Sequence, residues 1–181
     1  MHDTAPAELV RRRFREAHGA HVQPAYENMM TQSRGGVVKA ALGYRRAGAH
    51  PLFLERYLDA PVEQILSHAL GQDVRRETVL EIGNLAAEDA PSLIALWGAA
   101  ANDLGSQCEV AVATLTLELR RMFSRIGVPM LLLAPADASR AGQAASWGRY
   151  YDRDPWVCAG LIDEGQRAIA AFFARRRSLA A

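Results

Sequence analysis

The residues best suited to chemistry lie together in the segment Val79–Ala87, VLEIGNLAA. Side chains alternate along a strand, so Leu80 and Ile82 should share one face while Glu81 points to the other. A glycine within a strand, here Gly83, is typical of a bulge or of a close approach by a ligand or another backbone. An acid and an amide, Glu81 and Asn84, among aliphatic residues therefore predict a strand that presents polar groups to a ligand.

A second candidate region is the segment 135–155, which is rich in Ala, Gly, Ser, Asp and Arg and which we expect to be a functional loop. Its aromatic residues are Trp147, Tyr150 and Tyr151. Its charges alternate, with Arg149 and Arg153 next to aspartates. Such a cluster suits either gripping a carboxylate or phosphate or holding its own loop shut, and self-pairing is the expected role.

Metal and thiol chemistry are not supported by the spacing of cysteine and histidine. Cys108 and Cys158 lie far apart without a CxxC pair, so neither a metal site nor a disulfide framework is expected. Cys108 has no nearby His or Asp pattern to activate a thiolate. The histidines show no triad or metal spacing, and we expect His18 and His21 to be solvated.

Composition predicts one domain over residues 1–181, because 50% hydrophobic and 23% charged residues are ordinary for a globular chain of this length. The formal charge of +1 gives no global field toward nucleic acid or anionic lipid. No apolar run of about eighteen residues is present, so we expect no transmembrane segment and a cytoplasmic location. The sequence leaves open whether the chain forms a homodimer.

Apolar periodicity predicts helices that alternate with strands. The expected helices are 6–18, one following Pro61, 92–103, 115–126 and 163–173, and the expected strands are 25–32, 37–45, 79–87, 108–113, 129–134 and 156–162. Asp59 should cap the helix after Pro61, and the aliphatic strand 129–134 should be covered on both faces. This order predicts an α/β (α+β) fold with a central mixed sheet flanked by helices, antiparallel early and parallel in the middle.

Several blocks of the sequence resemble the thermostable haemolysin family. They are ALGYRRAG from Ala41, HPLFLERYLDAPVEQ from His50, EIGNLAA from Glu81, LLAPAD from Leu132 and WGRYYDRDPWVCAG from Trp147. That family is similar to the GCN5-related N-acetyltransferase (GNAT) superfamily, near the acyl-homoserine-lactone synthases. The resemblance implies a GNAT-like acyl-CoA N-acyltransferase fold, in which the strand matching Val79–Ala87 splays from its neighbour to hold an acyl thioester.

The resemblance further implies transfer of an acyl group from a thioester donor to a small amine, with roles for particular residues. Glu81 is the expected base, and its alternative role is a strand carboxylate paired with an arginine. Tyr150 or Tyr151 would protonate the leaving sulfur, and Arg45 would bind a carboxylate of the acceptor. The other expected substrate-binding residues are Asn84, Trp147, Arg149 and Arg153.

The expected donor depends on the segment Glu88–Ser92. At this place the superfamily usually has a glycine-bearing loop that grips the pyrophosphate of coenzyme A. Two acids repel phosphate and Pro91 lacks an amide donor, so the segment predicts a poor pyrophosphate cradle. An acyl-carrier protein would need less of this loop than coenzyme A, and loss of acyl transfer is a third alternative. The rival class is a non-catalytic lipid-binding or membrane-active protein, whose basic helix 6–18 would lie on anionic lipid.

Overall fold

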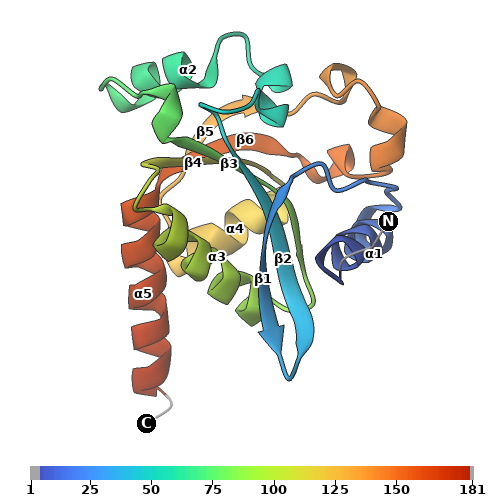
Figure 1. The fold of residues 1–181 in the computed structure, drawn as a ribbon, viewed down its shortest axis with the longest axis vertical. Coiled ribbons are helices and arrows are strands. Elements are labelled where there is room, and N and C mark those ends of the chain that lie inside the picture. The colour runs from blue at the N-terminus through green and yellow to red at the C-terminus, as the bar shows by residue number, and fades with distance from the viewer. Residues whose placement is uncertain (1–4, 180–181) are drawn as a thin grey trace.

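The computed structural model describes residues 5–179, which form a sheet with helices on both faces (Figure 1). The sheet has six strands in the order β1-β2-β3-β4-β6-β5. The strands are β1 Asn28–Arg34, β2 Val37–Arg46, β3 Val79–Ala87, β4 Val110–Leu115, β5 Leu131–Pro135 and β6 Trp156–Leu161. Only β3 and β4 pair in parallel, and the other neighbours are antiparallel. The mixed sheet flanked by helices is therefore as expected from the sequence.

The helices divide between the two faces according to the alternation of side chains along the strands. They are α1 Ala5–His18, α2 Val62–Leu70, α3 Ala90–Leu104, α4 Leu117–Ile126 and α5 Ile162–Leu179. Leu80 and Ile82 pack in one core with α3, α4 and α5. Val79 packs in a second core with α2 and the short helix η1 Phe53–Tyr57. Glu81 is therefore directed to the face of α2 and η1, as the alternation predicts.

On that same face, α1 covers the part of β2 and β3 that contains Ala41 and Ala86. Its apolar residues Leu9, Val10 and Phe14 are buried in a third core with Ala41 and Ala86. The basic residues between them remain on the outer side of the helix, which is the usual arrangement for an amphipathic helix.

The strands β3 and β4 separate part of the way along their length. Their parallel register runs from Val79 opposite Val110 to Ile82 opposite Ala113, although β3 continues to Ala87 and β4 to Leu115. On the other side of β3 the register against β2 shifts next to Gly83. Asn84 has a φ of 50°, a left-handed backbone that bends β3 at this point. The bend and the end of pairing coincide, and the two strands part beyond them.

Two local expectations are wrong. Pro61 occupies the N-cap position of α2 without a side-chain cap, and the Asp59 carboxylate pairs with Arg140 at 2.9 Å. The strand β5 is at the edge of the sheet, where Leu132 is 51% exposed, because β6 returns between β4 and β5. Periodicity alone cannot distinguish a doubly covered strand from an aliphatic edge strand.

An ion pair fixes the segment that precedes β3. Arg76 contacts Glu55 at 2.6 Å and Glu63 at 2.8 Å, and Glu55 also accepts the backbone N–H groups of Leu52 and Val62. These contacts hold η1 against α2, and the hydrogen bonds from Arg76 and the backbone lower the pKa of Glu55 to about 2.

This pKa predicts a specific loss of stability in acid. The Glu55 carboxyl has its ordinary pKa of about 4.5 when unfolded, so its contribution is complete above that value and is lost as the pH falls toward about 2. We expect Glu55→Gln to lower the free energy of unfolding at pH 7 by about 1 to 3 kcal/mol and to flatten its decline over this pH window. Urea denaturation at a series of pH values measures both effects.

The matched control is Glu109→Gln, because Glu109 is exposed. This variant should follow the wild-type curve. A Glu55→Gln curve that runs parallel to the wild-type curve between pH 4.5 and 2 would contradict the role of this carboxylate.

Candidate active site

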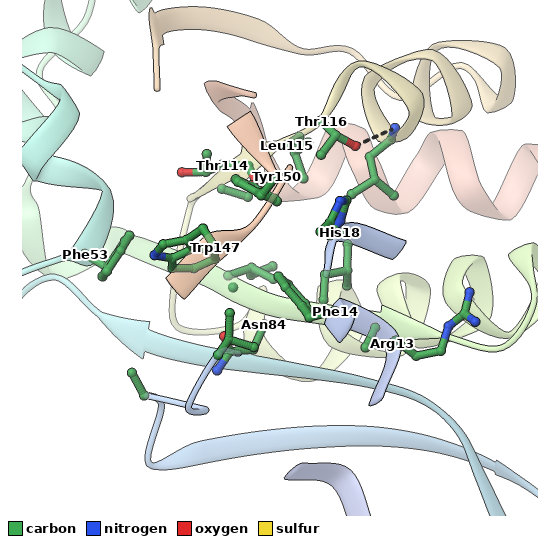
Figure 2. A pocket seen from close by; sticks show the side chains of 18 of the residues that line it. Arg13, Phe14, His18, Phe53, Asn84, Thr114, Leu115, Thr116, Trp147 and Tyr150 are labelled. Carbon is green, nitrogen blue, oxygen red and sulfur yellow. Dashed lines mark hydrogen bonds between the residues drawn. The ribbon is translucent and has the colours of Figure 1, made fainter. Parts of the chain in front are cut away.

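A cleft of about 1280 Å³ opens where β3 and β4 separate. Its walls come from the far ends of both strands, from α1, from η1 and from the loop between β5 and β6. Figure 2 shows Thr114, Leu115 and Thr116 together with Asn84, Phe14 and His18 around this space. The gap between β3 and β4 therefore opens into a cleft large enough to hold a small-molecule ligand.

Glu81 lies beneath the cleft and is almost completely buried, with 1% of its surface exposed. Its two carboxylate oxygens accept the backbone N–H groups of Phe53 at 2.9 Å and Leu54 at 2.8 Å. Burial raises the pKa of Glu81 because the charged form loses water, while the hydrogen bonds from Phe53 and Leu54 act in the opposite direction. The carboxylate is thus both a cap for the first turn of η1 and a group with increased proton affinity.

Arg45 is the nearest cation to this carboxylate, with its Nε 3.6 Å from a Glu81 oxygen. Its guanidinium also donates to the carbonyls of Ala25 at 2.7 Å and Pro51 at 3.2 Å. Glu81 is therefore paired with an arginine, which is one of the two roles that the sequence left open, and it also lines the cleft.

Tyr26 is a residue of this site that the sequence reasoning missed. Its ring lies across Gly43 of β2 and Gly83 of β3, which face each other in the register of the two strands. A Cβ on Gly43 would come within 2.6 Å of the Tyr26 side chain, and a Cβ on Gly83 would meet the hydroxyl at 2.1 Å. The Arg45 guanidinium lies over the ring at 4.6 Å from its centroid. Two glycines on strands expected to be neighbours were the available signal, since such a gap is commonly filled by an aromatic ring.

Tyr150 reaches the opposite side of the cleft, where β4 has lost its pairing with β3. Its hydroxyl donates to the carbonyl oxygen of Thr114 at 3.3 Å. The residue is 8% exposed and its ring contacts Phe14, His18 and Trp147. Burial raises the pKa of Tyr150, so that the phenol keeps its proton at neutral pH.

The other aromatic residues of the loop divide between the cleft and the neighbouring core. Trp147 lines the cleft with Phe53, and the two rings are 5.8 Å apart (Figure 2). Tyr151 is not among the residues that line it, and its hydroxyl is 2.7 Å from that of Tyr57. The structure therefore places Tyr150, and not Tyr151, on the wall of the cleft.

Arg153 and Asp154 of the loop pair with α4, so the expected self-pairing is wrong for these residues. Arg153 contacts Glu118 at 3.2 Å, and both residues line the cleft. Asp154 contacts Arg120 at 2.5 Å. Arg149 is exposed and does not line the cleft. The partners come from another element, which a local sequence pattern cannot reveal.

Two polar side chains that face the cleft have buried atoms without a hydrogen-bond partner among the described residues. These atoms are Nδ1 of His18 and Nδ2 of Asn84. His18 is half-buried, and burial together with the charge of Arg153 lowers its pKa, so the expectation of a solvated histidine is wrong. Unsatisfied polar atoms beside a cleft are typical of groups that bind a ligand.

The N-terminus of α3 does not fit the pyrophosphate of coenzyme A. The Asp89 carboxylate accepts the backbone N–H of Ser92 at 2.7 Å, and Glu88 pairs with Arg12 of α1. An acid therefore occupies the position in which a phosphate would meet the helix amides, and Pro91 contributes no N–H.

A second, smaller cavity of about 50 Å³ lies on the face of α3, α4 and α5. Its lining is almost entirely apolar, and it shares Ile82, Trp97, Ala113 and Leu115 with the cleft. The two spaces thus meet at the residues where β3 and β4 separate.

Two classes of site are not seen in the part of the chain that the structure describes. Within residues 5–179 no group of three or more His, Cys, Asp or Glu side chains is arranged to hold a metal ion. Over the same range, no helix combines the length and apolar character needed to cross a membrane.

Comparison with solved structures shows that the fold is that of GNAT-like acyltransferases. The acyl-homoserine-lactone synthase LasI is 13% identical, with a TM-score of 0.62 over 91% of this chain and 85% of that chain. FeeM, an N-acyl amino acid synthase from uncultured soil microbes, is 15% identical, with a TM-score of 0.59 over 91% of this chain and 92% of that chain. BjaI, a CoA-dependent acyl-homoserine lactone synthase solved with SAM and isopentyl-CoA, is 12% identical, with a TM-score of 0.59 over 94% and 81%.

Comparison with curated proteins gave no match. A family model described as thermostable hemolysin matches residues 2–166, which is most of the sequence. The match includes the cleft, Glu81 and the whole loop between β5 and β6. The chain belongs to the thermostable hemolysin family.

Proposed function

We propose that the protein transfers an acyl group from a thioester donor to the nitrogen of a small amine. The observation that carries this proposal is the separation of β3 and β4 above a buried carboxylate, with a tyrosine hydroxyl at the opposite strand. Solved structures with this fold include N-acyl amino acid and acyl-homoserine-lactone synthases, and their likeness supports the same class of reaction.

The reaction needs a group that takes a proton and another that gives one. The amine nitrogen attacks the thioester carbonyl, loses a proton to a base, and forms the amide as the carbon–sulfur bond breaks. Glu81 is the proposed base, because its raised pKa brings its proton affinity closer to that required near neutral pH. Tyr150 is the proposed acid, because its protonated hydroxyl lies against Thr114, just beyond the point where β4 leaves β3.

The backbone of β3 supplies a place for the thioester carbonyl. Beyond Ile82 the strand has no partner on its β4 side, so an acyl thioester can lie between the strands in place of a strand neighbour. Asn84, Trp147 and Arg153 line the same cleft and are proposed to orient the substrates. Arg45 is held by Glu81 and two carbonyls, and we propose that it fixes this wall and faces the acceptor.

The donor that these surroundings favour is an acyl chain on a carrier protein. Because Asp89 already caps α3, the site gives a coenzyme A pyrophosphate no amide cradle there. A carrier protein presents the acyl thioester without that group. The acceptor would be a small amine in the wide part of the cleft.

The alternative function is that of a membrane-active or lipid-binding protein. The packing of α1 disfavours the membrane-active protein. The apolar residues Leu9, Val10 and Phe14 are buried against the sheet. Insertion of this helix into a bilayer would remove it from the core and expose Ala41 and Ala86. Binding of a lipid in the cleft without chemistry remains the alternative that experiments must distinguish.

Release of free thiol tests the reaction directly. We expect the protein to release thiol from acyl thioesters only when an amine is supplied, and to form a new amide detectable by mass spectrometry. Glu81→Gln and Tyr150→Phe should each reduce kcat by about 100-fold or more. Glu109→Gln and Tyr44→Phe are the controls, because neither side chain lines the cleft.

Glu81→Gln also removes one acceptor from the N–H groups of Phe53 and Leu54. We expect it to lower the free energy of unfolding by about 1 to 3 kcal/mol, so rates are compared at a temperature where circular dichroism shows both proteins folded. Absence of thiol release with every donor and amine, together with retained lipid binding, would replace the proposed enzyme by the binding protein.

The smaller cavity predicts how the acyl chain is selected. We propose that a chain entering between β3 and β4 extends into this cavity, which Ala101 of α3 lines. We expect Ala101→Phe to reduce kcat/KM for an octanoyl donor by at least about 10-fold while changing the value for an acetyl donor little, since filling the cavity excludes only the end of a long chain. Asn102→Phe, at an exposed position of the same helix, is the control.

Equal losses for both donors in Ala101→Phe would mean that the variant damages the fold or the reacting centre. Unchanged selectivity would mean that the acyl chain does not enter this cavity.

A further inference from the structure

Glu81 lines the cleft, but too little of its side chain is exposed for an amine to approach the carboxylate freely. The side chain is 1% exposed, and its two oxygens already accept the N–H groups of Phe53 and Leu54. Turning the carboxylate toward the cleft would leave two amide groups at the start of η1 without partners, at a considerable cost in stability. A base held in this way needs a group between itself and the amine.

The Tyr26 hydroxyl is in that position. The ring of Tyr26 lies across the two strand glycines, and its hydroxyl is next to Gly83, the residue at which β3 leaves β4. Tyr26 lines the cleft together with Glu81 and Asn84. Arg45, which lies over the Tyr26 ring, is also 3.6 Å from a Glu81 oxygen, so the phenol and the carboxylate belong to one cluster on the same wall of the cleft.

The glycines make this position possible. A methyl group on Gly83 would lie 2.1 Å from the hydroxyl oxygen, and one on Gly43 would lie 2.6 Å from Cβ of Tyr26. Any other residue at either place would push the ring away from the strand and the hydroxyl away from the carboxylate. The Arg45 guanidinium covers the ring from its other side, 4.6 Å from the centroid.

We propose that Tyr26 is a catalytic residue that carries the proton from the acceptor amine to Glu81. As the amine nitrogen bonds to the thioester carbon, the phenol oxygen takes a proton from nitrogen and gives its own proton to a Glu81 oxygen. Glu81 ends neutral, Tyr26 keeps one proton throughout, and the thiolate leaves with a proton from Tyr150. The inference rests on the proposed function and names the path of the proton within it.

The surroundings of Tyr26 favour a relay over a free base. Burial raises the pKa of Tyr26 well above its ordinary value, and the negative charge of Glu81 adds to the effect. Tyrosinate is therefore not formed at neutral pH, whereas a protonated phenol can donate and accept in one step. The titratable and charged groups that act on its pKa are Glu81 from β3, Arg45 from β2 and Tyr150 from the loop.

The test compares Tyr26→Phe with wild type in the thiol-release assay. We expect kcat to fall by about 100-fold with KM for both substrates nearly unchanged, because only the proton path is lost. The loss should be smaller for hydroxylamine than for an alkyl amine, because the nitrogen of the hydroxylamine adduct is more acidic and gives up its proton to water more readily. Tyr44→Phe is the control, since Tyr44 packs on the opposite face of the sheet.

Two further variants keep the inference falsifiable. Gly83→Ala retains Tyr26 and Glu81 but displaces the hydroxyl, so it should show the same lower kcat and the same dependence on the amine. The double variant Tyr26→Phe/Glu81→Gln should lose no more than about the larger single loss, because both residues serve one path.

The outcomes separate this inference from the function on which it rests. If wild type releases no thiol with any donor and amine, the acyltransferase and the relay both fail. If wild type is active and Tyr26→Phe has a normal kcat, or loses rate equally for hydroxylamine and alkyl amines, the relay is wrong and the proposed function stands. Losses that multiply in the double variant would also overturn the relay.

Discussion

A buried carboxylate connects three parts of this molecule that are remote in sequence. Glu81 of β3 accepts the first amides of η1 and lies next to Arg45 of β2, and without these partners a charge with 1% exposure would cost far more than the fold gains elsewhere. The need to satisfy this buried charge brings η1, β2 and β3 together, and these elements form one wall of the cleft. The carboxylate is satisfied by backbone amides and Arg45, and the residue also lines the cleft.

Much of the architecture follows from the sequence because local patterns determine it. Alternation along Val79–Ala87 predicts the strand and the face on which Glu81 lies, and Gly83 marks the place where β3 bends away from β4. We expected β5 to be covered on both faces. An aliphatic run has the same sequence pattern whether its strand lies at the edge or in the middle of a sheet. The strand lies at the edge because β6 returns between β4 and β5, and a local sequence pattern does not reveal this strand order.

The candidate site was predictable only where one element supplies the chemistry. Glu81, Asn84, Trp147 and Tyr150 were proposed from the sequence, and the structure places them around one cleft. Arg149 lies outside it and Arg153 pairs with α4, since the partners of a surface charge come from whichever element folds against it. Tyr26 was missed because its role depends on two glycines that become neighbours only when β2 pairs with β3.

Backbone hydrogen bonds join the end of α1 to the loop between β5 and β6, beside the ring contacts of Phe14 and His18 with Tyr150. The carbonyl of His18 accepts the N–H of Arg149 at 2.8 Å, and the N–H of His21 donates to Ser146 at 2.7 Å. Residues more than a hundred positions apart thus close one rim of the cleft, which is a contact of high sequence separation. During synthesis the first helix has no partner for this rim until the loop has left the ribosome, so β1 to β4 can pair before the cleft has its final shape.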